Sequence, residues 1–262
     1  MDREVIWRYQ GFLYDEKRGL SIMTQSLRIT TIKGFFKWLE REGILFCNPA
    51  LKIPYPRKPK RLPRDIFTEE EIRRIFNAVE IDSKLGLRDK TILELLYTTG
   101  IRSGELCNLT LSDIQTEYRT LTVRAGKGNK DRVVPISEVA LAYLDEYLKF
   151  SRKQFKNAEN LPWLFVGIKG TKMQNRNIAP IVQKYAARAG LTRYTSAHMI
   201  RHSTATHMLR HGAPIRVLQE FLGHKKLDTT QIYAQVEIVD LKKVHSKYHP
   251  RERGLQVDEE AP

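Results

Sequence analysis

The sequence has 262 residues, of which 41% are hydrophobic, a share that is ordinary for a folded globular chain. Its 45 lysines and arginines against 30 acidic residues leave a net charge of +15, which favours a polyanionic partner such as DNA over a merely solvated basic surface. No stretch approaches the roughly 20 apolar residues of a membrane-spanning helix. The segment from Met1 to Gln10 lacks the apolar core of a signal peptide, so we expect a cytoplasmic protein.

The first 53 residues predict about two helices. Aromatic residues crowd the start, and a later set of apolar residues recurs at helical spacing and predicts an amphipathic helix that ends near Gly43. The aromatic residues are Trp7, Tyr9, Phe12 and Tyr14, and the helical set is Leu27, Ile32, Phe35, Phe36 and Leu39. Two helices make a thin core for an independent domain.

The sequence has two cysteines, Cys47 and Cys107. Each lies in a helix-like pattern, so we expect both to be buried, reduced thiols. This usage fits the cytosol and argues against a disulfide framework.

A proline-rich, basic segment from residue 54 to residue 64 predicts a linker. Its prolines exclude a continuous helix and favour extended chain. They are Pro54, Pro56, Pro59 and Pro63. The basic residues of the segment are expected to lie along a DNA backbone, with a plain solvated tether as the alternative. They are Arg57, Lys58, Lys60, Arg61 and Arg64.

Two helices are expected after the linker. Thr68 and Glu71 form a capping-box pattern, with Phe67 and Ile72 placed as a hydrophobic staple. The next helix runs through Leu93, Leu95 and Leu96 and is expected to stop at Gly100.

From Thr120 the apolar period changes to two, as expected for β-strands. Leu121, Val123 and Ala125 alternate with polar residues, and a second extended run covers Arg132 to Ile136. The G-K-G-N sequence between them predicts a hairpin with Lys127 in its turn. Lys130 and Arg132, on the same hairpin, are expected to bind DNA.

Arg102 follows the expected helix stop in the sequence T-G-I-R-S-G-E-L. Ser103 is a plausible N-cap for a short helix that contains Glu105, so Arg102 would add its donors to the positive end of that helix. Such a place suits an anion, although an isolated arginine is usually a surface charge.

His198 and Arg201 lie three residues apart in a helical run from Ser196 to His211, so their side chains project from one face. Arg201 can hold a phosphate oxygen, and His198 can exchange a proton near neutral pH. Five of the seven histidines fall between His198 and His224, a clustering that suggests zinc. No cysteine or carboxylate partners complete such a site, so we expect no metal; His202, His207 and His211 are expected to pack, to contact phosphate or to lie on the surface.

A short helix is expected to begin at Pro214 and to end at Gly223, before His224. Asp228 and Gln231 form another capping-box pattern, which starts a helix that carries Tyr233. A tyrosine is usually a core aromatic, and its pKa near 10 means that nucleophilic use requires neighbouring cations or a base.

Together these residues resemble the tyrosine recombinase (phage integrase) family, especially its Xer-like recombinases, from about Thr24 to Val236. The most selective match is R-H-S-T-A-T-H-M-L-R-H-G-A-P-I-R-V-L-Q-E-F-L-G-H followed by T-T-Q-I-Y. The resemblance implies that Arg102 and Arg201 clamp the scissile phosphate and that Glu105 supports the first of them. It further implies Lys127 as general acid, Tyr233 as nucleophile, His198 as an aid to proton transfer and His224 as a phosphate ligand.

The resemblance implies a mainly α fold with a small antiparallel β-hairpin (α+β). We expect a partial helical DNA-clamping region at 1–53, shortened relative to the family, then a linker at 54–64, a catalytic domain at 65–250 and a disordered acidic tail at 251–262. The segment after Tyr233, through Leu241 and Val244 to Tyr248, is expected to pack against a neighbouring subunit or to fold back on its own core.

The expected function is site-specific recombination of double-stranded DNA through a 3′-phosphotyrosyl intermediate and a Holliday junction, with no cofactor, metal or ATP. A homotetramer on two DNA sites, or pairing with a second recombinase, and a role in a mobile element or transposition follow from the same resemblance. Two alternatives stay open. One is a type IB topoisomerase, and the other is a non-catalytic DNA-binding protein, because Ala205 to His224 also fits helix, turn and helix.

Overall fold

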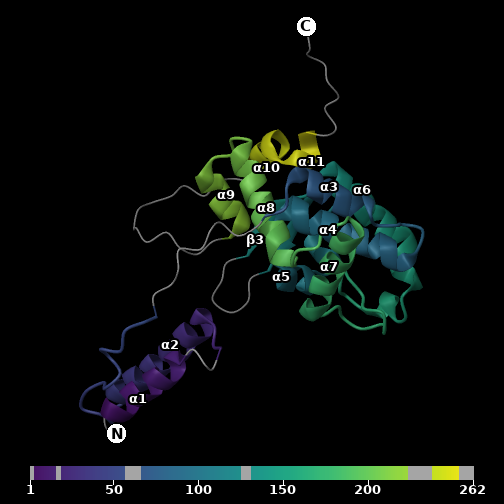
Figure 1. The fold of residues 1–262 in the computed structure, drawn as a ribbon. Helices are drawn as coiled ribbons and strands as arrows, with labels where there is room; N and C mark the ends of the chain where they lie inside the picture. The colour runs from purple at the N-terminus through teal and green to yellow at the C-terminus, as the bar shows by residue number, and fades with distance from the viewer. Residues whose placement is uncertain (1–2, 16–18, 57–65, 125–130, 224–237, 254–262) are drawn as a thin grey trace. The chain divides into compact units, whose positions relative to one another are not determined.

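The computed structural model of the chain describes residues 3–15, 19–56, 66–124, 131–223 and 238–253 (Figure 1). Its contacts divide the chain into two compact units, residues 1–64 and 65–262. Helices make up most of the described chain, and a small antiparallel sheet completes it, which confirms the expected fold class. Within the described part, none of the helices combines the length and apolar character that a bilayer crossing requires.

The described part of the N-terminal unit contains two helices, α1 (Arg3–Tyr14) and α2 (Ile22–Arg41). Ser21 caps α2 by accepting a hydrogen bond from the backbone N–H of Thr24 at 3.1 Å. The two helices and the segment after them share a small buried cluster of Ile6, Leu13, Ile29, Phe36, Ala50 and Ile53.

The expected helix is confirmed in α2, but its expected buried face is only partly right. Phe36 is buried, whereas Leu27 is 65% exposed and Phe35 is 51% exposed. Seven residues, nearly two turns, separate Phe36 from Ile29, the other apolar residue that α2 buries, so both lie on the same face of the helix. The sequence contains apolar residues on both sides of this helix, and only packing decides which side is covered.

The expectation of two buried cysteines is right for Cys107 and wrong for Cys47. Cys107 lies in a helix of the C-terminal unit, where burial raises the pKa of its thiol to about 11. Cys47 is exposed and lies beyond the end of α2 at Arg41. The apparent helical pattern around Cys47 therefore belongs to irregular chain.

The C-terminal unit holds the remaining described elements. Its helices and strands are, in chain order, α3 (Glu69–Asn77), α4 (Lys84–Thr99), α5 (Ser103–Asn108), β1 (Ile114–Gln115), β2 (Thr120–Val123), β3 (Arg132–Pro135), α6 (Glu138–Glu146), α7 (Ile178–Arg188), α8 (Ala197–Arg210), α9 (Ile215–Leu222), α10 (Ile238–Tyr248) and α11 (Pro250–Arg253). Short helical turns lie between them: η2 (Leu111–Asp113), η3 (Tyr147–Ser151), η4 (Arg152–Gln154), η5 (Ala158–Asn160) and η6 (Asn175–Asn177).

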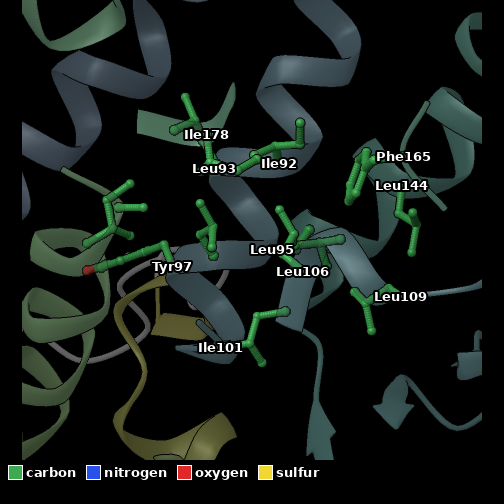
Figure 2. Close-up of a cluster of buried hydrophobic side chains, with 14 of the residues drawn as sticks. Ile92, Leu93, Leu95, Tyr97, Ile101, Leu106, Leu109, Leu144, Phe165 and Ile178 are labelled. Atoms are coloured by element: carbon green, nitrogen blue, oxygen red, sulfur yellow. The ribbon is translucent and has the colours of Figure 1, made fainter. Parts of the chain in front are cut away.

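Helix α4 forms the centre of this unit, and α3, α5, α6, α8 and β3 all contact it (Figure 1). Its residues from Gly86 to Thr99 are all buried, as expected for a helix enclosed on every side. Figure 2 shows Ile92, Leu93 and Leu95 of α4 in the same cluster as Leu144 and Phe165 from more distant parts of the chain. Each such side chain contributes roughly 1.5 to 3 kcal/mol through burial.

Two local signals in the sequence are confirmed at the helix ends of this unit. Thr68 and Glu71 form the expected capping box at the start of α3, and Phe67 and Ile72 are both buried in the main core. Helix α4 ends at Gly100, whose φ of 57° is the left-handed conformation that glycine adopts readily.

The sheet has three antiparallel strands in the order β1-β2-β3. The expected hairpin is confirmed in the register that pairs Thr120 with Pro135 and Val123 with Arg132. Strand β1 was not expected, because its two residues are too few to show a period. The expected turn at Lys127, and Lys130 after it, lie outside the described residues.

At the C-terminal end, α10 packs onto the core of its own unit. Leu241 is buried in the main cluster, and Val244 and Tyr248 pack against it. The disordered tail was expected from residue 251, but Arg251 belongs to helix α11. Its Nε and one Nη donate to the carboxylate of Glu94 in α4. The rest of that tail, residues 254–262, lies outside the described residues.

Candidate functional site

A pocket of about 450 Å³ opens where α5 and α8 begin. It is lined mainly by polar and cationic side chains from segments far apart in the sequence. The lining residues are Ile101, Arg102, Ser103, Gly104, Glu105, Asn108, Arg124, Asn175, Ala197, His198 and Arg201. The pocket therefore brings Arg102, His198 and Arg201 together, as the sequence predicts.

The turn after α4 places Arg102 at the pocket. Gly100 ends α4, and a Cβ there would lie 2.8 Å from Cδ2 of Leu222, so any larger residue at this position would push against α9. Arg102 is then the N-cap residue of α5, and Ser103 is its first residue, so the expected Ser103 cap is wrong by one position. The reason is Glu105, whose carboxylate accepts the backbone N–H of Arg102 at 2.8 Å.

The Glu105 carboxylate joins two arginines. Its Oε1 accepts from Nη1 of Arg102 at 3.0 Å and from Nη1 of Arg132 at 3.1 Å. Its Oε2 accepts from Nη2 of Arg132 at 2.8 Å, in addition to the backbone of Arg102. Burial by itself would raise the pKa of Glu105, but these hydrogen bonds outweigh it and lower the pKa to about 2. Glu105 is therefore an anion at neutral pH and fixes both guanidinium groups.

Arg201 approaches the pocket from α8 and is only 4% exposed. Its guanidinium donates to the carbonyl oxygens of Gly100 and Leu222, which lie at the C-terminal ends of α4 and α9. Burial, followed by the positive charge of Arg102, lowers the pKa of Arg201 to about 10. Because that value is still well above neutral pH, the side chain remains a cation, and the two helix ends offset part of its burial cost.

His198 lies one helical turn before Arg201 on α8 and is exposed at the pocket. The N-cap Ser196 starts the helix by accepting from the backbone N–H of Met199, so the run expected from Ser196 to His211 is confirmed. His207, on the same helix, is buried and hydrogen-bonds the Tyr97 hydroxyl and the Phe67 carbonyl, a packing role among those expected.

Arg124 also lines the pocket, and its position was not anticipated from the sequence. Its side chain is 64% exposed, and Nε donates to Oδ1 of Asp113 at 2.6 Å. The sequence signal that could have identified Arg124 is its position at the end of an expected strand, close before the G-K-G-N sequence. Asn108 and Asn175 could not be found this way, because only the tertiary fold brings them to the pocket.

The other predicted site residues divide into two groups. Arg132, expected to contact DNA, has a side chain only 16% exposed that pairs with Glu105. The remaining ones lie outside the described residues: Lys127, Lys130, His224, Tyr233, Arg57, Lys58, Lys60, Arg61 and Arg64. Within the described ranges, no three His, Cys, Asp or Glu side chains gather as a metal site would require.

The chemistry of the pocket suits an anion with several oxygen atoms. Two guanidinium groups, one held by a carboxylate and the other by two carbonyls, present fixed positive charge beside an exposed imidazole. Guanidinium groups recognise phosphate oxygens through paired donors. The pocket can therefore hold a phosphodiester group of a nucleic acid and stabilise negative charge on it.

Comparison with known proteins gives the family. The profile of the phage integrase family matches residues 65–238. Tyrosine recombinase XerC 2 of Ralstonia nicotianae is 42% identical over 252 residues, which cover 95% of this chain and 72% of the relative. Tyrosine recombinase XerD of Proteus mirabilis is 39% identical over 234 residues, which cover 89% of this chain and 74% of the relative.

Solved structures agree in fold. XerA recombinase is 32% identical and superposes with a TM-score of 0.58 over 93% of this chain and 82% of its own. The XerH site-specific recombinase bound to its difH substrate is 23% identical and has a TM-score of 0.68 over 99% of this chain and 70% of its own, a likeness of fold. The chain therefore belongs to the phage integrase family and is a site-specific DNA recombinase of the tyrosine type.

Proposed function

We propose that this recombinase cuts and rejoins double-stranded DNA through a covalent 3′-phosphotyrosyl bond to Tyr233. The observation that carries the proposal is the meeting of Arg102, His198 and Arg201 in one pocket. These residues come from segments about 100 positions apart, and they suit a phosphodiester whose charge rises during attack. The choice of Tyr233 as the nucleophile is supported by the family, because Tyr233 occupies the matching position of the T-T-Q-I-Y motif.

The two arginines stabilise the transition state. When an oxygen attacks the phosphorus, negative charge builds on the two non-bridging oxygens, and fixed donors already aimed at them lower the barrier. One such donor is worth roughly 3 to 4 kcal/mol in an enclosed site. Arg201 is held rigidly by two carbonyls, and Arg102 by Glu105, so neither has to reorganise during the reaction.

The proton transfers complete the step. The Tyr233 oxygen forms a bond to phosphorus, the bond to the 5′ oxygen breaks, and Lys127 gives its proton to that leaving oxygen. His198 accepts the tyrosine proton, and His224 donates to a non-bridging oxygen. The phosphotyrosyl bond conserves the energy of the broken bond, so a 5′ hydroxyl of another strand can reverse the reaction without ATP.

The basic residues outside the pocket would hold the duplex. Arg57, Lys58, Lys60, Arg61 and Arg64 precede the catalytic unit in the sequence, and Lys130 lies between the sequences of β2 and β3. The net charge of +15 supports contact with many phosphates. Strand exchange through a Holliday junction needs four active sites, so the protein would act as a tetramer on two DNA sites or together with a second recombinase. We place this activity in the cytoplasm, in the movement of a mobile element.

Product topology tests the proposed function. A supercoiled plasmid that carries two copies of the flanks of the gene would be incubated with the protein, and a plasmid without them would be the control. Recombination predicts deletion or inversion products only with the paired flanks. Relaxation of both plasmids without exchanged segments would instead indicate topoisomerase activity, and binding without any product would contradict the catalytic function.

A further inference from the structure

The Glu105 carboxylate is shared between two arginines, and every one of its acceptor positions is used. An ionised carboxylate has about four lone-pair positions. Two accept from the side chain and backbone of Arg102, and two accept from the guanidinium of Arg132. Arg132 thus takes the paired, bidentate arrangement, while the Arg102 side chain makes one hydrogen bond to Glu105.

The sharing of Glu105 between two arginines affects how far the Arg102 side chain extends into the pocket. With a single bond to Glu105, the Arg102 side chain lines the pocket and stays 48% exposed. Paired hydrogen bonds to a carboxylate are stronger and more directional than a single one. If the positions that Arg132 holds became vacant, Arg102 could turn both arms of its guanidinium onto Glu105 and withdraw from the pocket.

Arg132 itself is fixed tightly. Its side chain is 16% exposed, and among the described residues no hydrogen-bond partner reaches its buried Nε. Gly223, the C-cap of α9 with a φ of 65°, leaves room for this guanidinium, because a Cβ there would lie 3.0 Å from Nε and 3.1 Å from Cζ. Glycine suits this position because it has no side chain to press on the guanidinium and adopts a positive φ readily.

We propose that Arg132 is a positioning residue of the cleavage site: it occupies half of the Glu105 acceptors and so keeps Arg102 directed into the pocket. The inference rests on the proposed function, in which Arg102 clamps the scissile phosphate. It differs from the expectation that Arg132 contacts DNA, since a side chain that acts through Glu105 needs no phosphate of its own.

The first experiment compares Arg132→Lys with the matched control Arg119→Lys; Arg119 directly precedes β2, pairs with Glu138 and does not line the pocket. Lysine keeps the charge but cannot form the paired bonds. We expect the single-turnover cleavage rate at saturating nicked DNA to fall at least tenfold for Arg132→Lys, with the DNA dissociation constant and its salt dependence unchanged. Unchanged cleavage by Arg132→Lys, together with weaker DNA binding by the uncharged Arg132→Gln variant and a salt slope smaller by about one, would show a DNA contact and overturn the inference.

A double-mutant comparison tests the route through Arg102. In an Arg102→Ala background, Arg132→Lys should cause no further loss of cleavage rate, because the residue that it positions is gone. The same tenfold loss in both backgrounds would show that Arg132 acts by itself.

A crystal structure of the Arg132→Gln variant separates this inference from the proposed function, because it requires no catalysis. We expect both arms of the Arg102 guanidinium to contact Glu105 in that variant. An Arg102 that keeps its single bond and its place in the pocket would overturn the inference, whether or not the wild-type protein cleaves DNA. If wild type forms no covalent product but Arg102 moves as expected, only the proposed function fails.

Discussion

The guanidinium of Arg201 donates to the carbonyl oxygen of Leu222 over 2.6 Å, which ties a residue of the pocket to the last residue of α9. The same guanidinium also donates to the carbonyl of Gly100, at the end of α4. One buried side chain therefore serves the phosphate site and joins two helix ends. Substitutions of Arg201 should therefore change the stability and the cleavage activity to different extents.

Arg201→Lys should keep most of the stability but lose cleavage by at least about 100-fold, since an ammonium group can satisfy a carbonyl yet cannot reproduce the fixed fork of donors. Arg201→Ala should in addition lower the free energy of unfolding by about 2 to 3 kcal/mol, because two buried carbonyls lose a charged donor. Urea unfolding and single-turnover cleavage measure the two effects. Arg210→Ala, at the exposed end of the same helix, is the control. Equal losses of stability in Arg201→Ala and Arg210→Ala would contradict the role of Arg201 in joining α4 and α9.

The contact between Arg251 and Glu94 should anchor the C-terminal end. Glu94 is fully buried, and among the described residues its other ion-pair partner is Lys90, with Nζ 3.7 Å from the carboxylate. Arg251→Ala would leave a buried carboxylate with this longer contact, so we expect a loss of about 3 kcal/mol in the free energy of unfolding. Arg73→Ala removes an ion pair whose partners are both largely exposed and should change it by less than about 1 kcal/mol. Similar urea midpoints for the two variants would show that α11 is not anchored in this way.

How much the sequence predicts depends on how local each signal is. The capping box of Thr68 and Glu71 and the stop at Gly100 lie within a few residues of what they determine, and both are confirmed. The expected burial of Cys47 is wrong because α2 ends before it, and the exposure of Leu27 depends on what packs against each side of α2.

The pocket shows the same limit. Helical spacing sufficed to place His198 and Arg201 on one face, whereas the support of Arg102 by Glu105 came from the family resemblance and not from spacing. The pairing of Arg132 with Glu105 spans 27 residues and requires the hairpin to lie beside α5. Such a contact has no periodic signature in the chain, so it emerges only from the fold.

Stability should fall on mild acidification, and His249 should be one cause. Burial, followed by the neighbouring charge of His245, holds the pKa of His249 well below 6.5; Arg251 and His207 add to this, and the hydrogen bond with the Tyr97 carbonyl opposes it. Below pH 6.5 the unfolded chain therefore binds a proton that the folded chain excludes, and the free energy of unfolding falls by up to about 1.4 kcal/mol per pH unit for each such group.

His249→Gln should make this slope shallower between pH 7 and pH 5, measured as urea midpoints at several pH values. It should not abolish the slope, because burial also lowers the pKa of His207. Carboxylates with lowered pKa values, such as Glu71 and Asp113, lose their contribution only below about pH 4.5, outside this window. His202→Gln, on the exposed side of α8, is the control. An unchanged slope in His249→Gln would rule out this contribution.

Lys127 should be needed only when the leaving group requires a proton. We expect Lys127→Ala to slow cleavage of an ordinary phosphodiester by about 100-fold or more. A substrate with sulfur in place of the 5′ bridging oxygen has a better leaving group, so the variant should cleave it at nearly the wild-type rate. An equal defect on both substrates would assign Lys127 to binding and not to proton transfer.

Covalent capture tests the central claim most directly. Wild type and Tyr233→Phe would each be incubated with nicked duplexes from the flanks of the gene, separated under denaturing conditions, and the DNA-linked peptide identified by mass spectrometry. The account predicts a protein–DNA adduct in wild type alone, with the 3′ phosphate on Tyr233. An adduct on another residue, or one that persists in Tyr233→Phe, would contradict it, as would DNA binding with no adduct on any flank.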